Sequence, residues 1–414
     1  MDTTESLTGN RVSGRRITWV VVLLAISVLL NYVDRGAIGI AAPLMMKDLD
    51  LSATGFGIAV SAFFWIYAPI CLFVGWLCDR FCVYRMFAFG LALWAISTIL
   101  TGFVGGLAAL IVLRLMLGLG ESIAFPGSSK IFAAEVPSVH RGMANAAIAA
   151  ALAFGPAVGT LAGGTILEAA GWRPIFWIFG LVTLLWLLPW HFVSAPLRSK
   201  GIATPRIAPV PMKTIASKPA LWKMGVAHFT SNYGFYFLLA WLPLFLVRER
   251  GLGITDMTIL TTIGFATQGV VSLASGRLSD MLVARGMAEG QLRRYLMVVA
   301  QFMAAMSIAG LAVADSFAAI AALQVLAGTA AGIIAVNIFA VGQIFAGPRA
   351  AGGWIGLQNA IGNLSGILGP ILTGLIVDYL GGYGWAFGVS AAIAIVGALW
   401  WWLVIPPIEQ AIDD

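Results

Sequence analysis

Stretches of about 20 apolar residues recur along this 414-residue chain, and they restrict its fold more than any other feature of the sequence. Each stretch is long enough to cross the hydrocarbon core of a bilayer as a helix. Only 10% of the residues are charged, whereas soluble domains carry about 25% charged residues. The sequence therefore predicts an all-α membrane protein, in which a polar group inside a span needs a partner or a function.

Charged residues and Gly/Pro clusters divide the apolar sequence into twelve predicted transmembrane helices. Their approximate ranges are 17–41, 53–77, 84–104, 107–130, 141–167, 173–194, 220–247, 257–280, 293–313, 316–345, 351–377 and 383–405. The first run is too long for a cleaved signal peptide, so we expect it to remain as the first span. We predict an N-terminal six-helix bundle at 1–194, a cytoplasmic basic linker at 195–219 and a C-terminal six-helix bundle at 220–414.

Lys and Arg residues are distributed unevenly between alternate connections. With the N-terminus in the cytoplasm, eighteen fall on the inner side, four on the outer side and two, Arg35 and Arg114, inside spans. Because basic connections remain in the cytoplasm, this bias predicts a multi-pass plasma membrane protein with both termini inside. The basic residues form no continuous patch, so the net charge of +6 does not indicate binding to nucleic acid.

Two pairs of similar segments lie at corresponding places in the two halves. GWLCDRFCVYR at 75–85 follows the second span, and GRLSDMLVARG at 276–286 follows the eighth. FGPAVG at 154–159 in the fifth span is matched by LGPILTG at 368–374 in the eleventh. The repeats predict two pseudo-symmetric bundles with a substrate site between them, near the middle of the membrane.

Several segments also resemble a known family. Residues 75–85 resemble the loop signature of the major facilitator superfamily, Gly-x-x-x-Asp-Arg-x-Gly-x-basic-basic, although Cys82 replaces the second Gly and only Arg85 remains of the basic pair. Four further segments resemble the anion:cation symporter family: NYVDRGAIGIAAP (31–43), RLMLGLGESIAFPGSSK (114–130), PSVHRGMA (137–144) and HFTSNYGFYFLLAWLP (228–243).

This resemblance implies the major facilitator fold and a bacterial inner-membrane transporter that works by alternating access. Carriers of this family import hexuronate, aldonate, glucarate, tartrate or phthalate with protons. The resemblance further implies a monomer in membrane lipid, without a cofactor.

Four ionisable residues lie well inside the predicted spans of the first half: Asp34, Arg35, Arg114 and Glu121. An idle charge at mid-membrane costs about 2.5–3.5 kcal/mol. The spans place the first three at one depth, roughly 10 Å below the outer boundary, with Glu121 two turns deeper. Neighbours on a helix point about 100° apart, so Asp34 and Arg35 need different partners. A structural ion pair between Asp34 and Arg114 is one alternative, whereas Arg35 and Glu121 have no obvious idle partner.

The two arginines predict a site for an organic anion. The planar fork of an arginine donates two parallel hydrogen bonds to a carboxylate. We expect Tyr32 and Tyr67 to supply hydroxyl groups, and Gly118 to leave room for a small ligand or a close helix. The resemblance implies substrate contacts at Tyr32, Arg35, Tyr67 and Arg114. Weaker candidates for substrate contacts in the second half are the neutral residues Gln268, Asn359 and Asn363.

The two carboxylates offer a way to couple transport to protons. When Asp34 and Glu121 are both ionised, the four intramembrane charges sum to zero, and when both are protonated the sum is +2. Protonation therefore frees the arginines for an incoming anion without a metal ion. The resemblance also implies proton coupling at these two residues.

Charged residues at the inner ends of spans are predicted to form a conformational latch that stabilises one access state. Its members are Gly75, Asp79, Arg80, Arg85, Asp280 and Arg285.

Two alternative functions remain to be weighed. Gly142, Ala151, Gly155, Pro156 and Gly159 nearly fit a fifth-span pattern of proton antiporters of the same superfamily, which leaves a proton-coupled exporter as an alternative, although kinked close packing explains the pattern more simply. An enzyme is not expected, because the chain has no HExxH, GxSxG or CxxC motif and no phosphate loop.

Overall fold

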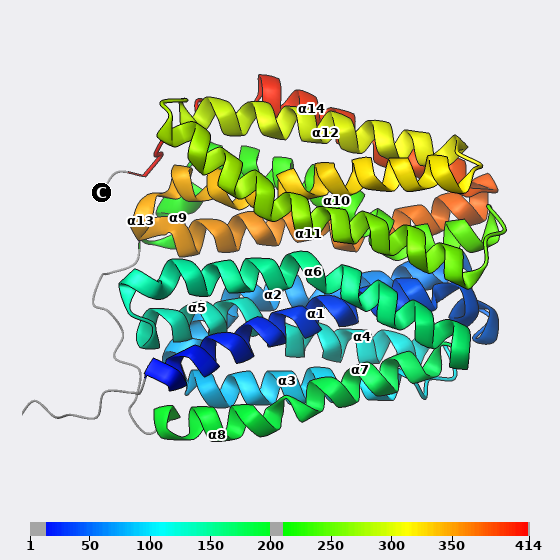
Figure 1. Cartoon of the computed structure of the whole chain (residues 1–414), viewed down its shortest axis with the longest axis horizontal. Coiled ribbons are helices and arrows are strands. Elements are labelled where there is room, and N and C mark those ends of the chain that lie inside the picture. The colour runs from blue at the N-terminus through cyan, green and yellow to red at the C-terminus, as the bar shows by residue number, and fades with distance from the viewer. Residues whose placement is uncertain (1–13, 199–209, 413–414) are drawn as a thin grey trace, which may run out of the picture.

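The computed structural model describes residues 14–198 and 210–412, which within these ranges form helices and no strands (Figure 1). The first half of the chain contains α1 (Gly14–Asp48), α2 (Ala53–Arg80), α3 (Val83–Thr101), α4 (Leu107–Glu121), α5 (Ala124–Glu135), α6 (Ser138–Ala170), α7 (Arg173–Leu185) and α8 (Leu187–Arg198). The second half contains α9 (Met212–Ala216), α10 (Pro219–Arg248), α11 (Ile254–Ala284), α12 (Glu289–Val313), α13 (Phe317–Leu380) and α14 (Tyr383–Leu403). Part of the predicted linker, 199–209, lies outside the described residues.

Within the described ranges, eleven helical stretches are long and apolar enough to cross a membrane, and the longest of them, α13, contains two spans. Its 64 residues are interrupted at Gly347, where a φ of 66° and a ψ of 173° depart from helical geometry. A positive φ favours glycine, and Pro348 disfavours the helical conformation of the residue before it. The predicted boundary between the tenth and eleventh spans is thus confirmed, and with it the twelve-helix membrane fold.

The fourth span is broken near its middle. Helices α4 and α5 together form one apolar stretch from Leu107 to Phe132, but α4 ends at Glu121. Pro126 has no N–H group for the carbonyl of Ser122, and its ring would clash with that carbonyl in a continuous helix. The break leaves Glu121 as the last residue of α4, in the interior of the span.

The first helix is longer than predicted. Its predicted end near residue 41 was set by Pro43, but α1 continues through this proline to Asp48. Proline is tolerated inside transmembrane helices because neighbouring groups satisfy the freed backbone. Arg35 therefore lies 13 residues, about 20 Å along the helix, from the end of α1, and the predicted depth of Asp34 and Arg35 below the membrane surface stays a prediction.

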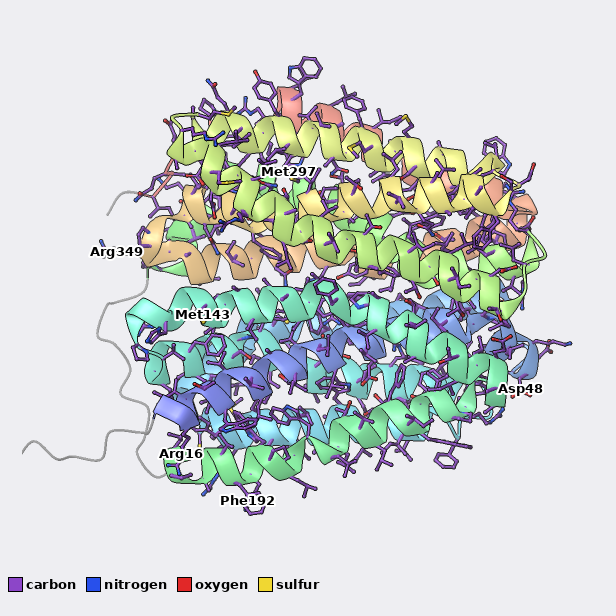
Figure 2. The ribbon with its side chains drawn as sticks, viewed as in Figure 1. Arg16, Asp48, Met143, Phe192, Met297 and Arg349 are labelled. Atoms are coloured by element: carbon purple, nitrogen blue, oxygen red, sulfur yellow. The ribbon has the colours of Figure 1, made fainter. Side chains whose placement is uncertain are left out.

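Helices α1 to α8 gather in one half of Figure 1, and α10 to α14 gather in the other. The beginning of α1, the end of α8 and the short helix α9 all lie at one end of the molecule, which we call the linker end because α8 and α9 flank the predicted linker. Figure 2 shows Arg16 and Arg349 at the linker end and Asp48 at the opposite end.

The repeated Gly-Pro segments pack in equivalent ways. In α6, a Cβ atom added to Gly159 would overlap the backbone of Val33 in α1, and α6 also packs along α11 of the other half. In α13, a Cβ atom added to Gly374 would overlap the backbone of Ala53 in α2, while α13 also packs along α10. Each segment thus lies between a helix of its own half and a helix of the other half, which is the close packing expected of these glycines.

Several contacts between the halves lie at the end opposite the linker. The Thr255 hydroxyl at the start of α11 donates a hydrogen bond to Glu168 near the end of α6, at 2.5 Å. The Asp378 carboxylate near the end of α13 accepts hydrogen bonds from the backbone N–H groups of Ala53 (3.1 Å) and Thr54 (2.8 Å), at the start of α2. A carboxylate at a helix N-terminus satisfies unpaired N–H groups and interacts favourably with the helix dipole.

Candidate functional site

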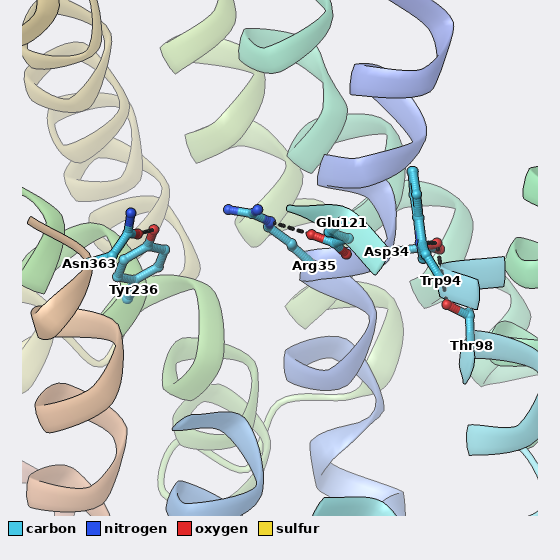
Figure 3. Close-up of polar contacts among 7 residues, drawn as sticks. All are labelled: Asp34, Arg35, Trp94, Thr98, Glu121, Tyr236 and Asn363. Carbon is cyan, nitrogen blue, oxygen red and sulfur yellow. Dashed lines mark hydrogen bonds and ion pairs between the residues drawn. The ribbon is translucent and has the colours of Figure 1, made fainter. Parts of the chain in front are cut away.

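All four intramembrane charges are buried. Asp34, Arg35, Arg114 and Glu121 are 3%, 6%, 4% and 0% exposed. Arg35 donates a hydrogen bond from Nε to Oε2 of Glu121 at 2.9 Å, as Figure 3 shows. The expectation that these two residues lack a partner is therefore wrong: they pair with each other.

Aromatic rings surround the Arg35 guanidinium. Its central carbon lies 5.0 Å from the ring centre of Tyr32, 5.0 Å from that of Phe63 and 4.6 Å from that of Tyr67. Tyr67 also stacks on Phe63 at 5.0 Å. Such contacts stabilise a buried cation through the negative faces of the rings. Tyr32 and Tyr67 thus contact Arg35 with their rings, and the use of their hydroxyl groups by a substrate stays a prediction.

Arg114 shares the Phe63 ring with Arg35. The Arg114 guanidinium carbon lies 5.4 Å from the ring centre, so the two guanidinium carbons are no more than about 10 Å apart. Within the described part of the chain, Nη2 of Arg35 and Nε of Arg114 are buried without a hydrogen-bond partner. Unpaired buried donors on charged groups are costly, and they mark a place suited to an anion.

Both arginines face a small cavity between the two halves. Its volume is about 20 Å³, which accommodates about one water molecule. The lining residues are Arg35, Ile38, Val60, Phe63, Phe64, Arg114, Tyr236, Leu239 and Ala240. The last three belong to α10, so the first half contributes both charges and the second half contributes a neutral wall.

One predicted residue of the second half supports this wall. The Tyr236 hydroxyl donates a hydrogen bond to Oδ1 of Asn363 at 2.7 Å (Figure 3), and the Tyr236 ring lies 4.7 Å from that of Phe64 across the halves. Asn363 in turn donates to the carbonyl of Asn359 at 2.9 Å. Asn363 thus contacts the wall residue Tyr236 and does not itself line the cavity. Gln268 is buried where α11 packs against α13. Substrate contacts at these three residues stay predictions.

Asp34 points away from the Arg35–Glu121 pair. Its Oδ2 accepts a hydrogen bond from Nε1 of Trp94 at 2.5 Å and one from the Thr98 hydroxyl at 3.5 Å, both on α3 (Figure 3). The prediction that Asp34 and Arg35 have different partners is confirmed. The alternative of an Asp34–Arg114 ion pair is not observed among the described residues, because the bonds of Asp34 go to α3 instead.

The close approach of α2 and α4 depends on Gly118. A Cβ atom at this position would overlap the carbonyl oxygen of Phe63, so the glycine brings α2 near the two arginines. The expected role of Gly118 beside a close helix is confirmed.

Sequence reasoning missed the aromatic residues of the site. Phe63 lies four residues before Tyr67, and Trp94 four residues before Thr98, so each pair shares one helix face. Those spacings were the available signal, but buried aromatic residues in a membrane protein resemble ordinary packing residues.

The predicted latch remains untested. Arg80, Arg85, Asp280 and Arg285 are exposed near the linker-end termini of α2, α3 and α11. Gly75 and Asp79 are not among the residues whose surroundings the structure describes.

Comparisons with known proteins place the chain in a family. The sequence matches the Major Facilitator Superfamily over residues 24–288 and 290–413. It is 27% identical to an ascorbate transporter of the Arabidopsis thaliana chloroplast, over 92% of this chain and 74% of that protein. It is 28% identical to a probable galactarate/D-glucarate transporter of Escherichia coli, over 92% of each chain.

The fold is similar to that of a solved bacterial homologue of the human lysosomal transporter Spinster in an inward-facing, unoccupied conformation. The TM-score is 0.79 at 16% identity, over 96% of this chain and 98% of that one. The match over nearly the whole sequence, together with the multi-pass helical architecture, leads to one conclusion: the chain belongs to the major facilitator superfamily and is a transporter rather than an enzyme.

Proposed function

We propose that this transporter is a secondary active symporter that imports an organic anion together with protons. One observation carries the proposal: two buried guanidinium groups face a single cavity between the halves, and each retains a buried N–H group without a partner in the described chain. Paired, rigid N–H donors of this kind suit a carboxylate.

Sugar acids and related carboxylates form the first class of substrates to test. The relatives named above are an ascorbate transporter and a probable galactarate/D-glucarate transporter, and the substrates in both names are organic anions. These names support the same substrate class for a chain that shares about a quarter of their residues over most of its length.

Proton coupling follows from competition for Arg35. When Glu121 is ionised, its carboxylate accepts the hydrogen bond from Nε of Arg35 and neutralises the charge of this arginine. Arg35 is then less available to a substrate anion. Protonation of Glu121 removes its charge, so Arg35 becomes available for the anion on the outer side. Loss of the proton on the inner side restores the ion pair and promotes release of the anion. Asp34 contributes a second protonation site to the same cycle.

Alternating access supplies the movement. We propose that residues 1–194 and 220–414 rock against each other as two bundles, joined by the linker at 195–219. Hydrogen bonds from the Thr255 hydroxyl to Glu168 and from the first N–H groups of α2 to Asp378 close the end opposite the linker, which supports an inward-facing state. A cavity of about 20 Å³ is too small for an organic anion, so binding needs the halves to separate around it.

The orientation follows from the basic connections. We propose that the linker end faces the cytoplasm of a bacterium, that both termini lie there, and that the transporter acts as a monomer in the inner membrane. The predicted latch of Asp79, Arg80, Arg85, Asp280 and Arg285 would then close the cytoplasmic end in the opposite state.

The proposal is tested by uptake into proteoliposomes with an imposed pH gradient. Purified protein is first tested in a thermal-shift screen with D-glucarate, D-glucuronate, L-tartrate, phthalate and ascorbate, and the most stabilising acid is then supplied in labelled form. Symport predicts accumulation when the outside is more acidic and none when a protonophore removes the gradient. Accumulation when the inside is more acidic would instead identify the proton antiporter. Failure of every acid to bind would contradict an organic-anion carrier.

A further inference from the structure

Trp94 touches both segments that carry the buried carboxylates. Its indole N–H donates to Oδ2 of Asp34 at 2.5 Å, as seen in Figure 3. The backbone of Trp94 packs against Gly120. A Cβ atom added to Gly120 would lie 2.7 Å from the backbone nitrogen of Trp94 and 2.9 Å from the Cβ atom of Trp94. Gly120 immediately precedes Glu121, the last residue of α4. One fully buried side chain thus joins Asp34 on α1 to the end of α4.

The charged groups around Asp34 are few. Glu121 and Arg114 of α4 act on it electrostatically, and Arg35 is its neighbour on α1. Helices α3 and α7 present neutral groups to it, namely Trp94, Thr98 and Thr183. Four further helices, α5, α6, α8 and α10, also pack on α1, and their charged residues lie toward one end or the other of the molecule. These residues are Lys130 and Glu135 in α5, Arg141 and Glu168 in α6, Arg198 in α8, and Lys223 and Arg248 in α10.

We propose that Trp94 is a positioning residue that sets the pH at which Asp34 exchanges its proton and that transmits this change to Glu121. This inference rests on the proposed proton symport. An indole N–H can only donate, so it stabilises the carboxylate form of Asp34 more than the neutral acid. Oδ1 of Asp34 has no hydrogen-bond partner among the described atoms, so we assign the proton to this oxygen.

Tight packing converts this local change into movement of α4. When Asp34 becomes neutral, its hydrogen bond from Trp94 weakens, and the indole is held less firmly. Because the backbone N and Cβ of Trp94 lie against Gly120 with no room for an added Cβ atom, a shift of α3 at Trp94 is passed to α4 at the residue before Glu121. Asp34 can thus influence the Arg35–Glu121 pair without contacting it.

The test compares Trp94→Phe with Trp186→Phe. Both substitutions remove one buried indole N–H donor to α1, but Trp186 donates to the backbone carbonyl of Leu23 at 2.9 Å instead of to a carboxylate. Uptake of labelled D-glucarate is measured over a series of outer pH values with a constant pH difference across the membrane. Loss of a hydrogen bond to a charged group shifts the midpoint of uptake to higher pH by about one unit in Trp94→Phe. Trp186→Phe keeps the wild-type midpoint.

A titration without substrate uses the pH dependence of the melting temperature of the purified protein. The part of the profile that disappears in Asp34→Asn belongs to Asp34. We expect Trp94→Phe to move that part to higher pH, as it moves the midpoint of uptake. In the Asp34→Asn background, Trp94→Phe has no further effect on the profile. If Trp94→Phe does not fold, Thr98→Val, which removes the second donor at 3.5 Å, produces a smaller shift of the same sign.

The outcomes separate the two proposals. Equal midpoints in wild type and Trp94→Phe, or an equal shift in Trp186→Phe or in the Asp34→Asn background, would overturn the role of Trp94. If wild-type protein binds no acid of the panel and shows no gradient-driven uptake, proton symport itself fails. The melting profiles still decide whether Trp94 controls Asp34 in that case.

Discussion

The guanidinium of Arg35 is bonded to the carboxylate of Glu121, although 86 residues separate them in the chain. The bond joins α1 to α4 at the break in the fourth span, where Glu121 is fully buried. A buried ion pair of this kind is strongly destabilised when one partner alone loses its charge. The pair is therefore well suited to respond to a proton.

Replacement of Glu121 by Gln is expected to uncouple transport from the pH gradient. The Gln carbonyl can still accept the Arg35 Nε–H bond, but the side chain stays neutral and resembles the protonated state. Accumulation driven by an acidic exterior falls by about tenfold or more, whereas exchange of labelled for unlabelled anion across the membrane persists. Proteoliposome assays of accumulation and exchange check this. Glu289→Gln, which alters an i,i+4 pair with Arg293, serves as a control and retains both activities; accumulation that persists in Glu121→Gln would remove Glu121 from the coupling step.

The substitution Arg35→Lys is expected to lose most transport. An ammonium group keeps the positive charge but cannot make the forked contact with a carboxylate, nor the planar stacking against Tyr67. We expect uptake to fall by about tenfold or more, with a matching loss of thermal stabilisation by the bound acid. Arg173→Lys, which changes a partly exposed arginine paired with Asp48, is the matched control. Near-normal uptake in Arg35→Lys would assign Arg35 a structural role.

Removal of the Asp378 carboxylate is expected to open the end opposite the linker. Asp378→Ala leaves the first N–H groups of α2 without their acceptor, at a cost of about 1 kcal/mol, which is a population change of about fivefold. A cysteine introduced by Leu239→Cys at the cavity, with Cys71, Cys78 and Cys82 replaced by Ser, then reacts faster with an impermeant maleimide added outside. Asp48→Ala, which removes a carboxylate bonded within one half, leaves the labelling rate unchanged. Equal rates in the two variants would show that Asp378 does not stabilise closure.

Two glycines of α2 offer a further test of closure. A Cβ atom at Gly57 would overlap the carbonyl oxygen of Pro370 in the other half, whereas one at Gly55 meets only ordinary contacts within its own half. Gly57→Ala should therefore reduce uptake by about tenfold or more and increase maleimide labelling from outside, without loss of folding. Gly55→Ala should behave like wild type. Normal uptake in Gly57→Ala would mean that α2 and α13 need not approach this closely during transport.

Most of the fold was predictable because transmembrane spans are specified by local composition. The twelve spans and the boundary at Gly347 and Pro348 follow from apolar length and proline geometry. Pro43 misled the prediction of α1, because a proline that would end a soluble helix is accommodated within a membrane bundle.

The charges of the site were also predictable, whereas their partners were not. Asp34, Arg35, Arg114 and Glu121 stand out in sequence because the membrane makes them costly. The pairing of Arg35 with Glu121 joins α1 to α4 across 86 residues of sequence, and local periodicity does not encode which helices pack together. The bond from Trp94 to Asp34 could not be separated from ordinary aromatic packing for the same reason.

The cavity wall from α10 carries no charge, since Tyr236, Leu239 and Ala240 face two arginines that both belong to the first half. Under the proposed mechanism, substitutions in α10 and at Asn363 can change the shape of the cavity while Asp34, Arg35, Arg114 and Glu121 stay intact. Such a division would let related carriers differ in substrate while they keep the same coupling to protons.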